Sequence, residues 1–188
     1  MPWLFTLLGY FLGSLPTAYI AGHMTRGIDI RHVGDRNVGA ANAYRELGHK
    51  TGILVFFIDA GKGALAVLIA QAATLSQLGI LAVGVAALLG HNWPVFIGFR
   101  GGRGVSTTIG VFLAVLTTPM LIMAGPATAA LLIKKNVTLA CAILFVPLPL
   151  VCWWLGSPGA LVSYSIALPG LVGVTHYLRT RRKVPHRV

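Results

Sequence analysis

The stretch G-I-L-V-F-F-I-D-A-G-K-G-A-L-A-V-L-I-A-Q-A, from Gly52 to Ala72, decides the class of fold. It is almost wholly apolar, and it is as long as the roughly 20 residues that an α-helix needs to cross the hydrocarbon core of a bilayer. Four further stretches share this length and composition: Trp3 to Gly22, Gln77 to Ile97, Asn136 to Gly156 and Gly159 to Leu178. We therefore expect an all-α integral membrane protein with several transmembrane helices.

A sixth apolar stretch, Gly104 to Ile133, has two interpretations. It forms either one long tilted helix or two short helices separated at Thr117, Thr118 and Pro119, because proline breaks or kinks a helix. If it crosses the membrane twice, 14 of the 15 Lys and Arg residues lie on one side, and the exception is Lys62 inside a span. The positive-inside rule then predicts a bundle of seven transmembrane helices, with the N-terminus outside and the C-terminus in the cytoplasm. The bases that only this arrangement brings to the cytoplasmic side are Lys134, Lys135, Arg179, Arg181, Arg182, Lys183 and Arg187.

The composition excludes a soluble domain of this size. Of 188 residues, 56% are hydrophobic and 10% are charged, and the mean hydropathy is +0.79. The formal net charge is +11, but the bases lie between apolar segments and not along an aromatic-rich face, so we expect no nucleic acid partner. Anionic substrates and anionic membrane lipids at the cytoplasmic surface fit the charge better. We expect one membrane domain, residues 1–188, and the sequence predicts no oligomeric state.

The segment F-R-G-G-R-G-V-S-T-T, from Phe99 to Thr108, is the most informative polar segment. Its glycines leave backbone N–H groups free to point at an oxyanion, Arg100 and Arg103 supply charge, and hydroxyl side chains open the next helix. This combination predicts a phosphate or carboxylate cradle. The alternative is a flexible basic loop that contacts lipid headgroups. The glycines and hydroxyl residues concerned are Gly101, Gly102, Gly104, Ser106, Thr107 and Thr108.

Other polar side chains are also candidates. Asn37 and Asn42, in the segment Gly34 to Arg45, can bind hydroxyl groups or can cap a turn. Asp59 and Lys62 share one face of a helix inside the membrane, where a structural ion pair and a substrate contact are equally good explanations. His91 and His176 are candidates for a base, a ligand or a phosphate donor, although a structural role is commoner for such residues. We expect no metal site, because no carboxylate or cysteine cluster accompanies the histidines.

Several motifs follow one another in register along the chain. They are G-S-L-P-T-A-Y from Gly13 to Tyr19, which contains Ser14; R-E-L-G-H-K-T-G-I-L from Arg45; D-x-x-K-G from Asp59; G-H-x-x-P-x-F from Gly90; and F-R-G-G-R-G-V-S-T from Phe99. In this order and spacing the chain resembles the acyl-phosphate-dependent glycerol-3-phosphate acyltransferases of bacterial membranes. The resemblance covers nearly the whole chain.

The resemblance implies a seven-span enzyme of the cell membrane with its active site on the cytoplasmic face. Such an enzyme moves a fatty acyl group from acyl phosphate to the 1-hydroxyl of glycerol 3-phosphate and needs no metal or coenzyme A. The resemblance assigns the binding of the donor phosphate to Gly101, Gly102, Arg103, Gly104 and Thr107. It places near the acceptor Asp35, Asn37, Asn42, Arg45, Cys141, His176 and Arg179. The residues expected to be catalytic are His176, Arg103, Asn37 and Arg45, and the other site candidates are Ser14, Asp59, Lys62 and His91.

The chain departs from the family pattern on the acceptor side. Asp35 and Arg36 stand where the family usually has serine and glycine, Cys141 stands at a serine position, and Arg179 at an asparagine position. An acid beside a dianionic acceptor repels it unless an arginine neutralises that acid. We therefore expect Asp35 to pair with Arg36 or Arg179, and glycerol 3-phosphate or a related polyol phosphate to be the acceptor. The alternatives from other classes are a small anion channel or transporter and a non-catalytic lipid-binding protein.

Overall fold

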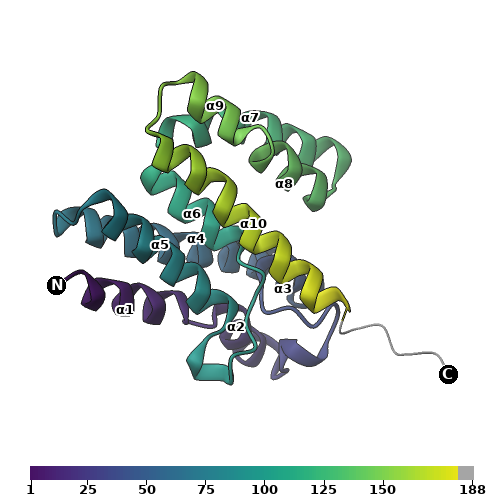
Figure 1. Ribbon diagram of the computed structural model, residues 1–188. Coiled ribbons are helices and arrows are strands. Elements are labelled where there is room, and N and C mark those ends of the chain that lie inside the picture. Colours follow the sequence, from purple (N-terminus) through teal and green to yellow (C-terminus); the bar gives the residue numbers. More distant parts are fainter. Residues whose placement is uncertain (182–188) are drawn as a thin grey trace.

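The computed structural model describes residues 1–181, and the whole of this part folds into a bundle of helices (Figure 1). Arg182, Lys183 and Arg187, three of the tail bases expected in the cytoplasm, lie outside the described residues. The elements are α1 (Pro2–Gly13), α2 (Thr17–Arg26), η1 (Ile30–His32), α3 (Ala40–Leu47), α4 (His49–Ala72), α5 (Gln77–Asn92), η2 (Val95–Ile97), α6 (Val105–Val115), α7 (Thr117–Lys134), α8 (Val137–Phe145), α9 (Leu148–Trp154) and α10 (Gly159–Arg181).

Within residues 1–181, six helical segments are long and apolar enough to cross a membrane. They are Pro2–Arg26, His49–Ala72, Gln77–Ile97, Thr117–Lys134, Val137–Trp154 and Gly159–Thr180. The seventh apolar helix, α6, has 11 residues, which is about 16 Å of helix and roughly half of a hydrocarbon core. The helix is interrupted between α6 and α7 at Leu116, which belongs to neither helix. A break at the start of Thr117 to Pro119, one of the two interpretations of this stretch, is therefore confirmed.

Two other spans that the sequence predicts as continuous helices are broken. The first divides into α1 and α2, with Pro16 as the residue before α2. The span from Asn136 divides into α8 and α9 around Pro147. Proline lacks the N–H that would continue the helical hydrogen bonds, and its ring clashes with the preceding turn. Pro126 and Pro169 lie inside α7 and α10 without ending them, so proline alone does not decide where a span breaks.

Glycines bring α1 and α5 into backbone contact. A Cβ on Gly13 would lie 2.0 Å from the carbonyl oxygen of Ala87, and a Cβ on Gly9 would lie 3.0 Å from that of Val83. These contacts advance together along both helices, so α1 and α5 run in the same direction. The N-terminus and the α4–α5 connection therefore lie at the same end of the bundle, as Figure 1 shows at the left. Small residues at such contacts let the backbones of neighbouring membrane helices approach closely.

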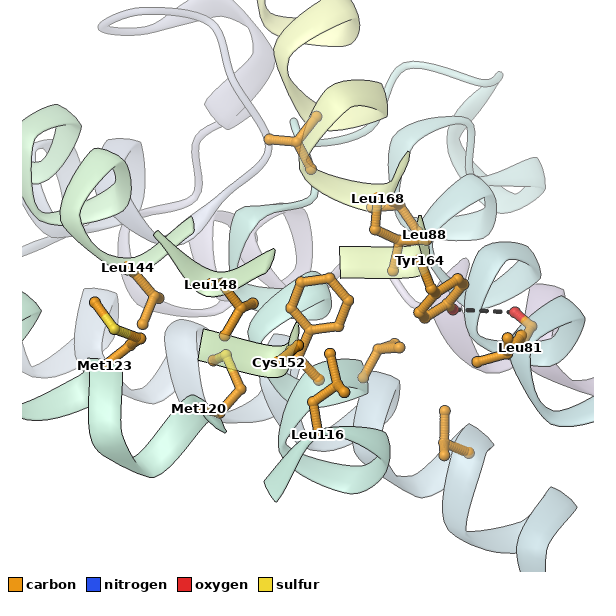
Figure 2. Packing of buried hydrophobic residues seen from close by; sticks show 14 of the residues in the cluster. Leu81, Leu88, Leu116, Met120, Met123, Leu144, Leu148, Cys152, Tyr164 and Leu168 are labelled. Atoms are coloured by element: carbon orange, nitrogen blue, oxygen red, sulfur yellow. Dashed lines mark hydrogen bonds between the residues drawn. The ribbon is translucent and has the colours of Figure 1, made fainter. Parts of the chain in front are cut away.

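The main apolar core joins the C-terminal helices to the centre of the bundle (Figure 2). Leu116, between α6 and α7, and Met120 of α7 pack with Leu148 of α9 and Leu168 of α10, and all four are buried. The hydroxyl of Tyr164 donates a hydrogen bond of 3.0 Å to the carbonyl oxygen of Leu81, which satisfies a buried polar group in this core. The core thereby fixes the position of α10, whose C-terminal end reaches the polar loops.

The polar segments meet at one end of the bundle. They are the loop between α2 and α3 (residues 27–39, hereafter the first loop), the loop between η2 and α6 (residues 98–104, the glycine-rich loop) and the C-terminal end of α10. The side chain of Arg31 donates to the carbonyl oxygen of Ile97 at 3.1 Å, and Thr175 donates to that of Arg103 at 3.3 Å. Segments far apart in the sequence are thus hydrogen-bonded to one another around a shared site.

Candidate functional site

A cavity of about 370 Å³ lies where the first loop, the glycine-rich loop and α10 meet. Among the described residues that line it, five are arginines and one is an acid, Asp35. The arginines are Arg31, Arg36, Arg100, Arg103 and Arg179. A concave site with this excess of guanidinium groups attracts anions and suits phosphate in particular, since arginine binds phosphate oxygens bidentately.

A second cavity, of about 420 Å³, lies at the opposite end of the bundle. It is bounded by the α6–α7 break and by the turn before α10, where Leu116, Thr117 and Leu161 contribute to its wall. The described residues that line it include none with a charge. The anion-binding chemistry of the described chain is therefore concentrated in the cavity between the polar loops.

Two buried polar atoms in the charged cavity have no hydrogen-bond partner among residues 1–181. They are Nε of Arg103, which is a donor, and Oδ1 of Asn37, which is an acceptor. Both residues line the cavity, and Asn37 is 8% exposed. A buried polar group normally has a partner, so a ligand or an ordered water is expected at both atoms. The pair is suited to an anion next to a hydroxyl group.

Asp35 connects two of the arginines. Its Oδ2 lies 3.0 Å from Nη2 of Arg45 and 3.4 Å from Nη1 of Arg103. Its Oδ1 accepts a hydrogen bond of 3.1 Å from the backbone N–H of Asn37. The expected pairing of Asp35 with an arginine is confirmed, but the expected partners, Arg36 and Arg179, were wrong.

The first loop takes its shape from an unusual backbone. Gly34 has φ +58° and Arg36 has φ +57°, the left-handed region that glycine adopts most readily. A Cβ on Gly34 would lie 2.4 Å from Oδ1 of Asn42, so this position needs glycine. Arg36 adopts the same conformation with a long side chain, at some cost in backbone strain.

Asn42 fixes the shape of this loop through hydrogen bonds to its backbone. It is fully buried, and its amide nitrogen donates to the carbonyl oxygens of Ile30, Val33 and Asn37 at 3.4, 3.2 and 3.1 Å. Its Oδ1 accepts the backbone N–H of Asp35 at 3.1 Å. Asn42 was expected to contact the acceptor, but its polar atoms are engaged with the backbone and it is absent from the described cavity wall. The geometry gives it the role of shaping the loop that carries Asn37.

At Gly101 and Gly102 the glycine-rich loop does not have the free backbone N–H groups of the expected anion-binding cradle. The backbone N–H of Gly101 donates to the carbonyl oxygen of Asn92 at 3.2 Å. The backbone N–H of Gly102 donates to the carbonyl oxygen of His91 at 3.0 Å. The prediction that these two amides are free to bind an oxyanion was therefore wrong. A Cβ on Gly101 would lie 2.1 Å from the carbonyl oxygen of His91. The glycines let the loop pack against the end of α5, and this packing positions Arg103.

Gly104 and Thr107 lie at the start of α6. Gly104 has φ +92° and precedes the first helical residue, Val105, so the first-turn amides have no partner within the helix. A Cβ on Gly104 would lie 2.1 Å from the side chain of Leu88. Thr107 is fully buried against Gly63 of α4, and its hydroxyl has no partner among the described residues. Of the five expected donor-phosphate residues, Gly101 and Arg103 line the cavity, whereas Gly102, Gly104 and Thr107 do not.

The C-terminal end of α10 brings two further expected residues to the site. The guanidinium of Arg179 donates to the carbonyl oxygens of Gly101 and Asn92, so it joins α10 to the glycine-rich loop and to the end of α5. His176 is exposed, and its ring lies within electrostatic range of Arg103 and Asp35. Arg179 therefore lies in the cavity wall, whereas His176 does not line the cavity and lies only in the neighbourhood of Arg103 and Asp35.

The intramembrane pair lies in a separate buried cluster. Nζ of Lys62 lies 2.8 Å from Oδ1 of Asp59 and donates to the carbonyl oxygen of Leu15 at 2.8 Å. Thr17 donates to the same carboxylate oxygen at 3.0 Å, and Nδ1 of His91 lies 3.7 Å from it. Lys62 thus satisfies a backbone carbonyl at the break between α1 and α2. Of the two explanations for Asp59 and Lys62, the structural tether fits this geometry.

Ser14 and Cys141 also lie away from the cavity. Ser14 is fully buried at the end of α1, with a hydroxyl that has no partner within the described part of the chain. Cys141 is partly buried in α8, a helix that packs against α7, α9 and α10. The structure does not bring Cys141 to the expected acceptor site. In residues 1–181 there is no group of three or more His, Cys, Asp or Glu side chains that could hold a metal ion.

Arg31 also lines the cavity and was not among the residues expected at the site. Its Nη2 lies 2.7 Å from Oδ2 of Asp29, and its guanidinium lies over the ring of Tyr19 at 4.8 Å. The hydrogen bonds from Arg31 lower the pKa of Asp29 to about 2, and the same pair raises the pKa of Arg31. The spacing D-x-R after a helix was the available signal, since Asp29 caps the short helix η1.

Comparison with known proteins gives one family throughout. Residues 3–184 match the family described as glycerol-3-phosphate acyltransferase. Glycerol-3-phosphate acyltransferase 4 of Dehalococcoides mccartyi is 51% identical over 182 residues, which cover 97% of this chain and 98% of that relative. A glycerol-3-phosphate acyltransferase of a Synechococcus species is 38% identical over 85% of this chain and 80% of its own length. The crystal structure of PlsY, an integral membrane glycerol 3-phosphate acyltransferase in its glycerol 3-phosphate form, has a TM-score of 0.84 and 33% identity, covering 96% of this chain and 90% of PlsY.

Proposed function

The chain belongs to the glycerol-3-phosphate acyltransferase family and is a multi-pass membrane acyltransferase of phospholipid synthesis; we propose that its acyl donor is acyl phosphate. The acyl group goes to the 1-hydroxyl of glycerol 3-phosphate, and the products are lysophosphatidate and inorganic phosphate. One observation supports this most strongly. The cationic cavity contains a buried unpartnered donor on Arg103 and a buried unpartnered acceptor on Asn37, among the described residues. A phosphate group and a hydroxyl group satisfy them together.

The chemistry needs little from the protein beyond position and charge. Acyl phosphate is already activated, so the acceptor oxygen attacks the carbonyl carbon, the bond from that carbon to the phosphate oxygen breaks, and phosphate leaves. Arg103 neutralises the charge that develops on the leaving phosphate, which is the largest contribution that a polar site makes to such a reaction. We propose that a phosphate oxygen of the substrate takes the hydroxyl proton, so that no strong protein base is required.

The residues divide between the two substrates. Arg103 and the glycine-rich loop, Gly101 to Gly104, hold the donor phosphate, with the loop acting mainly by positioning Arg103. Asn37 accepts the hydrogen bond of the acceptor hydroxyl. The acceptor phosphate lies near Arg45, Arg179 and His176, beside Asp35. The amide of Asn42 is bonded to the backbone of its own loop, Thr107 is buried against Gly63, and Cys141 lies in α8, so we assign these three residues no direct contact with either substrate.

The arrangement of the helices supports an orientation in the cell membrane. We propose that the single domain crosses seven times, with α6 as a short crossing, the N-terminus outside and the charged cavity facing the cytoplasm. The parallel course of α1 and α5 and the position of the arginines at one end of the bundle agree with the positive-inside rule. A reporter fused to the C-terminus should be active in the cytoplasm, and activity only outside the cell would overturn this topology.

The donor is tested with purified protein in detergent. Palmitoyl phosphate, palmitoyl-coenzyme A and glycerol 3-phosphate are the probes, and both phosphate release and lipid product are followed. We expect turnover with palmitoyl phosphate alone as donor. Turnover with the coenzyme A thioester and none with acyl phosphate would refute the proposed donor. A panel of other polyol phosphates tests the acceptor. Because Asp35 adds a negative charge to the site, this panel shows whether a polyol phosphate other than glycerol 3-phosphate is the preferred acceptor.

A further inference from the structure

We infer that Asp35 is a specificity-determining residue of this site: its carboxylate is a built-in anion between Arg45 and Arg103 that an incoming phosphate group must displace. The inference rests on the proposed function, because it concerns how the acceptor phosphate binds. Both guanidinium nitrogens lie within 3.4 Å of one carboxylate oxygen, Oδ2. An acceptor phosphate that binds Arg45 would therefore enter the space that this oxygen now fills, beside the donor-binding Arg103.

The carboxylate is held firmly but remains accessible. Its Oδ1 accepts the N–H of Asn37 at 3.1 Å, and the backbone N–H of Asp35 donates to Asn42 at 3.1 Å. The side chain of Asp35 is 28% exposed, and that of Arg45 is 51% exposed. The loop thus presents one carboxylate oxygen to the cavity, where solvent and a soluble anion can both reach the ion pairs.

Two opposing effects follow from this position. Asp35 orders the two arginine side chains, which lowers the entropy cost of binding an anion. It also neutralises part of their charge and repels a phosphate held nearby. Repulsion outweighs ordering for a dianion, because charge repulsion at such distances exceeds the entropy of one or two side chains. The effect on a singly charged phosphodiester is half as large in free energy, so Asp35 disfavours dianionic acceptors relative to monoanionic ones.

The substitution Asp35→Asn tests this directly. Asparagine keeps the size of the side chain and the oxygen that accepts the N–H of Asn37, and it removes the charge. We expect the KM for glycerol 3-phosphate to fall about tenfold and that for its monoanionic methyl phosphodiester about threefold, with kcat changed less than threefold. Glu46→Gln is the matched control. Glu46 is the next acid along the chain, lies in α3, and takes part in none of the ion pairs of the described residues, so both KM values should stay unchanged.

Binding of inorganic phosphate, measured by calorimetry on the same proteins, separates this inference from the proposed activity. Asp35→Asn should bind phosphate about tenfold more tightly than wild type even if the enzyme uses another acceptor. Equal or weaker phosphate binding by Asp35→Asn would overturn the inference, whatever the turnover. Failure of every protein to acylate glycerol 3-phosphate would overturn the proposed function alone. If Asp35→Asn does not fold, Asp35→Ser, which also removes the charge, must give the same shift in phosphate affinity.

Discussion

Gly102→Ala should disable the site while leaving the bundle intact. A Cβ on Gly102 would lie 2.0 Å from Nε2 of His91 and 2.6 Å from the carbonyl oxygen of Val38, whereas real Cβ contacts essentially never fall below 3.0 Å. The loop must therefore retreat by up to 1 Å from the end of α5, because the ring of His91 is itself buried next to Asp59. A displacement of about 1 Å in a group that positions substrate costs about a hundredfold in rate. We expect kcat/KM to fall about a hundredfold and the free energy of unfolding to fall by about 1 to 3 kcal/mol.

The assay is phosphate release from palmitoyl phosphate in the presence of glycerol 3-phosphate, with thermal unfolding measured on the same preparation. Gly61→Ala is the matched control, since a Cβ at this exposed position in α4 meets nothing within 4 Å. It should keep kcat/KM within about twofold of wild type. A Gly102→Ala protein with wild-type melting temperature and wild-type kcat/KM would refute the account of the loop as the element that positions Arg103.

Three further predictions concern charge. Arg103→Ala should lower turnover by about two to three orders of magnitude while Arg103→Lys keeps much more activity, because a charge-assisted contact to the leaving phosphate is lost only in the first; normal turnover by Arg103→Ala would show the donor site to be misassigned. Lys62→Met leaves the buried carboxylate of Asp59 without its cation and should destabilise the protein by about 3 to 5 kcal/mol, and adding Asp59→Asn should restore most of it in thermal unfolding. The pKa of Asp29 is about 2, below its ordinary value, so its pair with Arg31 stabilises the protein above about pH 4. That stability, about 1 to 2 kcal/mol, should disappear as pH falls towards 2, and Asp29→Asn should remove this pH dependence.

The membrane class was predictable because it depends on local sequence, and the break before Thr117 was predictable because the distribution of Lys and Arg along the chain favoured two helices over one. A run of about 20 apolar residues makes a helix long enough to cross the membrane. The proline of a T-T-P sequence interrupts the backbone hydrogen bonds of a helix within a few residues. The breaks at Pro16 and Pro147 had the same local signal, yet Pro126 and Pro169 do not end their helices. What differs at the first break is tertiary, because the side chain of Lys62 satisfies a carbonyl at that point.

The site was predictable in its residues and less so in their roles. The glycines and Arg103 mark the loop in the sequence, but its amides donate to His91 and Asn92, which are brought there by the path of α5. In the same way, Arg179 and Asn42 were expected to bind the acceptor. In the structure their side-chain N–H groups donate to backbone carbonyl oxygens of the protein. Partners of this kind depend on the packing of distant segments, which one sequence does not specify.

We propose that this chain transfers an acyl group from acyl phosphate to glycerol 3-phosphate in the cationic cavity. The most direct measurement is the stoichiometry of the reaction, with radiolabelled glycerol 3-phosphate and palmitoyl phosphate supplied to the purified protein. The account predicts one mole of inorganic phosphate released for each mole of labelled lysophosphatidate formed, with release dependent on the acceptor. Phosphate release without labelled lipid, or labelled lipid formed without acyl phosphate, would contradict it.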